Sequence, residues 1–124
     1  MRIVWLGLVG VLFFGCAALR DDLRHAEQAF SEARYENAQT WLTDLEPNVP
    51  EMDRELRSRF YYLSGMTAFR TGERARAKHY LALCREEAGD AGVGLTPDWR
   101  TNLAVTLRDL GAAGGEEAPA SSGS

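Results

Sequence analysis

The strongest constraint on the fold is the spacing of apolar residues, which recur every three or four positions from Arg20 to Leu110. This period is typical of helices, and no segment shows the period-two alternation of a half-buried strand. Turn signals at Pro47–Pro50, Thr71-Gly72 and Gly89–Gly94 divide the pattern. We therefore expect an all-α fold of about five helices, over residues 20–33, 35–46, 51–70, 73–88 and 97–110.

The expected helices repeat along the chain. Small residues recur at steps of thirty-nine positions, as Ala26, Gly65 and Ala104. A period of 20–50 residues built from helix pairs indicates a solenoid, in which small residues let paired helices approach closely. Further positions match at the same step: Ala33, Gly72 and Gly111; Ala38 and Ala77; Leu42 and Leu81; Leu45 and Cys84.

The segment Tyr61-Tyr62-Leu63-Ser64-Gly65, followed by Gly72, Ala77, Leu81 and Cys84, resembles a tetratricopeptide repeat (TPR). The resemblance covers residues 20 to about 111 and implies a short α-solenoid of two to two-and-a-half TPR-like hairpins. The third repeat is a half, similar to the closing helix of the family. The residues leave one alternative open, a five-helix bundle whose internal repeats are accidental.

The resemblance also implies a concave groove, lined by the first helices of successive repeats, that holds a peptide or a partner helix. Aromatic and arginine side chains are typical anchors of such an interface. An alternative remains, in which the large side chains of the second hairpin pack against the first. The residues at the implied groove positions are Leu23, Glu27, Phe30, Arg59, Tyr62, Met66, Phe69 and Arg70.

The N-terminal segment has the pattern of a secretory signal peptide. Arg2 precedes an uncharged stretch from Ile3 to Gly15, which ends in small residues around Cys16. The Gly15-Cys16 junction resembles the lipobox of bacterial lipoproteins, which implies diacylglycerol and an N-acyl chain on Cys16. More than one chain gives stable anchoring. In that family, Ala17 after the cysteine implies export to the outer membrane rather than retention at the inner one.

Two alternatives to acylation stay open. Phe13 and Phe14 occupy positions where the lipobox has a leucine-like and a small residue. The uncharged stretch from Ile3 to Leu19 is at the lower edge of the length that crosses a bilayer, so an uncleaved helix is the first alternative. Ordinary secretion is the second. All three place the folded part on the non-cytoplasmic side of the membrane, facing the periplasm of the bacterial cell envelope.

The chain therefore divides into four segments. A signal peptide covers residues 1–15, and an acylated anchor covers 16–19. A TPR-like helical domain covers 20–111. Residues 112–124 contain only Gly, Ala, Ser, Glu and Pro, which cannot bury enough apolar surface to offset chain entropy, so we expect a disordered tail.

Charge and motifs argue against several functions. The net charge of −4 does not favour a nucleic-acid binder, whose surface is usually basic. The two histidines, His25 and His79, lie in separate helices, and no metal, phosphate-loop or nucleophile motif occurs. Cys84 lies in an apolar helical stretch, where a lone cysteine packs as a small hydrophobic residue. We expect no enzyme, no metal and no small-molecule substrate.

Two functions agree with these features. The first is a membrane-anchored adaptor that binds a protein partner in an envelope assembly or secretion complex. The alternative is a structural envelope lipoprotein, a helical bundle without a peptide groove.

Overall fold

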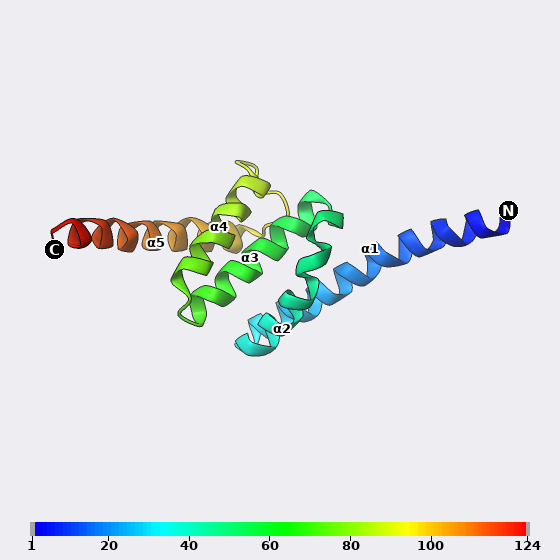
Figure 1. The fold of residues 1–124 in the computed structure, drawn as a ribbon, viewed down its shortest axis with the longest axis horizontal. Helices are drawn as coiled ribbons and strands as arrows, with labels where there is room; N and C mark the ends of the chain where they lie inside the picture. The colour runs from blue at the N-terminus through cyan, green and yellow to red at the C-terminus, as the bar shows by residue number, and fades with distance from the viewer. Residues whose placement is uncertain (1, 124) are drawn as a thin grey trace.

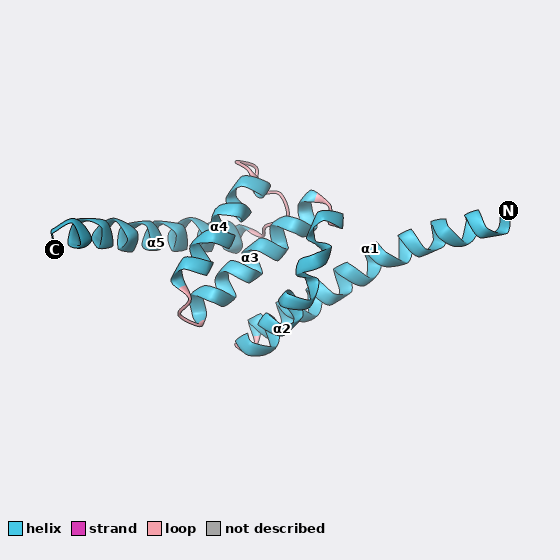
Figure 2. Ribbon diagram, in the orientation of Figure 1, coloured by secondary structure: helices cyan, strands magenta, loops and turns pink. Residues whose placement is uncertain are grey.

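The computed structural model describes the backbone of residues 2–123 and the side chains of residues 17–111. Every regular element in this part of the chain is helical, which confirms the all-α prediction (Figure 2). The elements are α1 (Arg2–Ser31), α2 (Tyr35–Leu45), the 3-10 helix η1 (Glu46–Glu51), α3 (Arg54–Arg70), α4 (Arg74–Ala88) and α5 (Pro97–Gly123). Helices α1 and α2 form one hairpin, α3 and α4 form a second, and α5 packs against α4 (Figure 1).

The two hairpins turn in the same way. After α1, Ala33 adopts φ 60°, and the amide of Arg34 donates to the carbonyl of Ala29 at 2.8 Å. After α3, Gly72 adopts φ 84°, and the amide of Glu73 donates to the carbonyl of Ala68 at 2.9 Å. Each turn is thus a Schellman motif with a left-handed residue after the helix. The left-handed residues are thirty-nine positions apart, which is the period expected from the sequence.

These equivalent turns carry different residues, and the difference predicts two opposite effects on stability. A side chain at positive φ costs about 1–2 kcal/mol, which glycine avoids. We expect Ala33→Gly to raise the free energy of unfolding by about 1 kcal/mol and Gly72→Ala to lower it by a similar amount. A Cβ added at Gly72 meets no atom within 4 Å, so its effect is that of the backbone alone. Urea unfolding of the full chain measures both changes, and effects of equal sign would contradict the shared geometry.

Side chains cap the N-termini of two helices, α3 and α5. Oδ1 of Asp53 accepts the amide of Leu56 at 2.8 Å at the start of α3. Oγ1 of Thr96 accepts the amide of Trp99 at 3.1 Å at the start of α5. Each cap satisfies an amide that has no partner within its helix.

The core runs through both hairpins and onto α5, and it repeats the sequence pattern of the hairpins. Ala38 and Ala77 are both fully buried, and the equivalent pair Leu42 and Leu81 is buried as well. Gly65 lies against Leu81, since a Cβ added to the glycine would stand 2.5 Å from Cδ2 of that leucine. The small residue therefore allows α3 and α4 to approach closely, as the repeat predicts.

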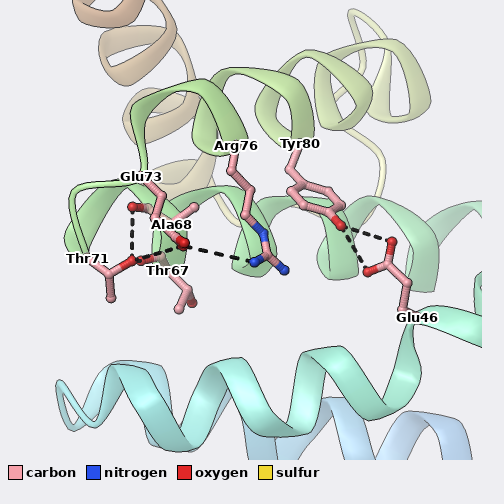
Figure 3. Close-up of polar contacts among 7 residues, drawn as sticks. All are labelled: Glu46, Thr67, Ala68, Thr71, Glu73, Arg76 and Tyr80. Atoms are coloured by element: carbon pink, nitrogen blue, oxygen red, sulfur yellow. Dashed lines mark hydrogen bonds and ion pairs between the residues drawn. The ribbon is translucent and has the colours of Figure 1, made fainter.

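Polar contacts also join the hairpins. The hydroxyl of Tyr80 on α4 donates to the carboxylate of Glu46, which follows α2, at 2.9 Å (Figure 3). Burial, and then the hydrogen bond to this carboxylate, raise the pKa of Tyr80. The connector expected at Pro47–Pro50 forms part of η1, where Val49 packs against the core.

Both terminal helices are longer than the sequence predicts. Helix α1 begins at Arg2 rather than Arg20, and α5 continues past Gly111 (Figure 1). Gly111 takes no left-handed conformation, so no C-cap ends the helix there. The side chains of the predicted signal peptide, 1–15, of Cys16 and of the predicted tail, 112–124, lie outside the described residues, and these three assignments stay predictions.

Candidate functional site

A hollow of about 120 Å³ lies between α1 and α3, the first helices of the two hairpins. Leu23 and Leu56 are buried and form its apolar floor. Charged side chains form the remainder of the lining: Arg20, Arg24, Glu27, Glu55 and Arg59. Three of the eight predicted groove residues, Leu23, Glu27 and Arg59, therefore lie together.

Two polar contacts of residues at this hollow link α1, α3 and the loop after α4. A guanidinium nitrogen of Arg20 lies 3.2 Å from a carboxylate oxygen of Asp53, which joins α1 to the start of α3. Nε of Arg59 donates to the carbonyl of Gly94 at 2.9 Å, which ties α3 to the loop after α4. Arg59 is thus engaged within the fold, whereas Arg24 and Glu27 form no ion pair with any side chain of residues 17–111.

Two predicted groove residues face the interior instead. Tyr62 and Met66 are 1% and 3% exposed, so their assignment to a partner surface is wrong. The ring of Tyr62 stacks on Trp99 of α5, with centroids 4.3 Å apart, and its hydroxyl accepts from Nδ2 of Asn102 at 3.2 Å. Burial raises the pKa of Tyr62. The physical reason is that α5 covers this face of α3.

The remaining predicted residues lie apart from the hollow. Phe30 makes an edge-to-face contact with Tyr35, with centroids 5.6 Å apart, at the turn of the first hairpin. Phe69 is half-buried against the core, and Arg70 is exposed in the last turn of α3. The eight residues therefore do not form one continuous surface.

A second hollow, of about 370 Å³, lies where α4 and α5 meet, at residues that the sequence pattern did not predict as a site. Three arginines and three apolar residues line it: Arg85, Arg100, Leu103, Ala104, Leu107 and Arg108. The one indication of this hollow in the sequence was Ala104, which lies thirty-nine positions after Gly65. Trp99 lies one step after Phe60, so the same register could also have placed it in the core.

A third hollow, between α2, α3 and α4, is too small for a ligand. Its volume of about 10 Å³ leaves room for no more than about one water molecule. The hydroxyls of Ser64 and Thr67 line it and have no hydrogen-bond partner in the described part of the chain.

The groups that could carry chemistry are dispersed or inaccessible. Cys84 is fully buried, as expected, and burial raises its pKa to about 12. His25 stacks on Trp41 with centroids 4.8 Å apart, and His79 lies on another helix. Among residues with described side chains, no group of three His, Cys, Asp or Glu residues could hold a metal ion.

Comparisons with protein-family models, with curated proteins and with solved structures each found no match. In the described part of the chain, no helix has both the length and the apolar character needed to cross a membrane.

Proposed function

We propose that this chain is a lipid-anchored, non-enzymatic adaptor with TPR-like repeats that binds a protein partner in the bacterial cell envelope. The observation that carries the proposal is the hollow between α1 and α3. It lies between the first helices of two hairpins whose turns are equivalent, which is where the TPR resemblance puts a partner. Its apolar floor and charged rim have the composition of a protein interface.

The anchor is proposed from the leader sequence. Cys16 follows Gly15 and precedes two alanines, as in the lipobox resemblance, and acylation there would place the domain beside a membrane. Helix α1 includes Cys16 and continues into the first hairpin. The acyl chains would therefore sit on the same helix that contributes Leu23 and Glu27 to the hollow. Periplasm-facing attachment to the outer membrane is the location that Ala17 favours.

Crosslinking in intact cells with tagged full-length protein tests the partner surface. We expect Glu27→Lys to reduce the yield of the crosslinked partner about tenfold, because it reverses one charge at the rim of the hollow. Asp44→Lys is the matched control, since Asp44 is exposed on α2 outside the hollow and the charge change is the same. Equal yields from the two variants would contradict binding in the hollow.

Fractionation of the same cells tests the anchor. Cys16→Ser removes the thiol that would be acylated, so the protein should leave the outer-membrane fraction. The crosslink should then be lost as well if anchoring brings the partner within reach. Unchanged fractionation would favour the uncleaved helix.

A structural bundle without a groove ligand is the second candidate. The burial of Tyr62 and Met66 favours it, because the aromatic and methionine anchors are not on the surface. In that case Glu27→Lys would leave all crosslinks unchanged, and partners would be lost only when the fold itself is disrupted.

A further inference from the structure

The face of α5 around Ala104 has no helix paired with it within the described residues. Gly65 occupies the equivalent position on α3 and lies against Leu81 of α4. Ala26 occupies it on α1 and is fully buried in the hairpin with α2. Ala104 is exposed instead, because α5 is the first helix of a half repeat. The repeat register therefore presents a helix-pairing position to solvent.

The hollow at this face combines an apolar floor with a basic rim. Leu103 is buried at its base, whereas Arg85, Arg100 and Arg108 are exposed around it. None of these three arginines forms an ion pair with another side chain of residues 17–111. Val105, which follows the lining residue Ala104 in the sequence, is 56% exposed.

Loop geometry leaves room for one of these arginines. Gly92 adopts φ 67°, and a Cβ there would stand 2.5 Å from Nε of Arg100. The glycine therefore leaves room for the Arg100 side chain to lie along the loop between α4 and α5. Since Arg100 pairs with no carboxylate of residues 17–111, its charge stays available at the rim of the hollow.

We propose that this surface docks an acidic amphipathic helix of a partner protein, which takes the place of the missing second helix of the half repeat. The pairing register favours a helix, since the equivalent positions Ala26 and Gly65 both face one. The three arginines favour a partner helix that has carboxylates beside its apolar stripe, because charge-assisted hydrogen bonds to arginine are strong and directional. The proposal deepens the proposed adaptor function by giving the chemistry of a partner at a surface separate from the α1–α3 hollow.

Neither the C-terminal segment nor α2 has the composition of the occupant. Residues 112–124 include no large apolar side chain that could fill the hollow. Helix α2 is acidic, but Ala38, Leu42 and Leu45 are already buried in its own hairpin. Helix α2 of a second copy would therefore offer acidic groups without an apolar stripe.

Direct binding in detergent micelles tests the proposal with the full chain. The probe is a fluorescent helical peptide with a leucine stripe flanked by glutamates, and its control carries lysines instead. We expect the acidic peptide to bind and the lysine peptide not to bind. Arg108→Glu should weaken the affinity for the acidic peptide about tenfold. Lys78→Glu is the matched control, since Lys78 is exposed on α4 outside the hollow, and we expect at most about a twofold change there from screened long-range charge.

A second variant separates helix docking from simple charge attraction. Ala104→Leu leaves all charges in place and blocks close approach at the pairing position, so it should also weaken binding about tenfold. Equal binding by Arg108→Glu and Lys78→Glu, or no effect of Ala104→Leu, would overturn the proposal. Displacement of the peptide by phosphatidylglycerol in the micelles would assign the face to lipid headgroups instead. Concentration-dependent dimers that Arg108→Glu dissolves would assign it to a second copy.

Because the peptide is added to purified protein, this outcome is independent of the crosslinking experiment. If the acidic peptide does not bind but the Glu27-dependent crosslink forms, only the proposal for the α5 surface is rejected. Peptide binding without any Glu27-dependent crosslink would reject the α1–α3 hollow alone.

Discussion

Replacing Tyr62 by alanine is expected to lower the free energy of unfolding by about 3–5 kcal/mol. The side chain is almost fully buried, stacks on Trp99 and accepts a hydrogen bond from Asn102. Its removal leaves a cavity between α3 and α5 and takes away the main aromatic contact that holds α5. A domain of about 95 residues has a total stability of about 5–14 kcal/mol, so the loss is a large fraction of it.

Urea unfolding of the full chain in mild detergent, followed by circular dichroism, measures this loss. Tyr62→Phe is the control, because it keeps the ring stack and removes only the hydroxyl, at a cost of about 1 kcal/mol. If Tyr62→Ala were as stable as Tyr62→Phe, the ring would not be enclosed by α5, and Tyr62 would again be available to a partner.

This result determines how the partner surface should be tested. Lost binding by a Tyr62 variant would report a damaged fold, because the residue lies between two helices. Glu27 and Arg108 are better probes, since their side chains reach solvent at the rims of the two hollows. Changes there alter charge at an interface with little effect on the core.

The local features of the fold were predictable from the sequence. Helix starts and ends depend on neighbouring residues, so Thr96 marks the start of α5 and Gly72 the turn after α3. The repeat register was also visible, because equivalent positions need equivalent sizes. It correctly placed Ala77 and Leu81 in the core and Gly65 at a close helix approach.

The faces of α3 that are buried were harder to predict from the sequence. Every residue from Tyr62 to Ala68 is buried, because helices pack around α3 on several sides. The segment is apolar or small all round, which is typical of a buried helix rather than of one with a single exposed groove face. Periodicity tells which residues share a face, but the position of α5 over Tyr62 depends on contacts about forty residues away in the chain.

Both hollows combine residues from different helices. Their complete sets of lining residues could therefore be determined only from the folded structure. Arg85 on α4 and Arg108 on α5 belong to one hollow only because the two helices pack together. The sequence could predict Leu23, Glu27 and Arg59 as a group because the resemblance to a TPR implies their spatial relation. On α5 the thirty-nine-residue step marks only small residues, Ala104 and Gly111, so it did not indicate the arginines around the second hollow.

The close approach of α3 and α4 at Gly65 carries the second large effect. Glycine inside a helix normally costs about 1 kcal/mol relative to alanine, so replacing it usually stabilises. Here an added Cβ would stand 2.5 Å and 2.6 Å from Cδ2 and Cγ of Leu81, and 3.1 Å from its backbone nitrogen. Leu81 is fully buried and has little room to move. Overpacking therefore outweighs the gain in helix propensity.

We expect Gly65→Ala to lower the free energy of unfolding by about 2 kcal/mol, the net of about 3 kcal/mol of overpacking and about 1 kcal/mol of helix propensity. Gly111→Ala is the matched control, because a Cβ there meets nothing within 4 Å, and it should stabilise by about 1 kcal/mol. In a Leu81→Ala background, Gly65→Ala should cost less than in the wild type, since the clashing atoms Cγ and Cδ2 of Leu81 are gone. Stabilisation by Gly65→Ala in the wild-type background would mean that the two helices of the second hairpin lie further apart than their shared small residues indicate.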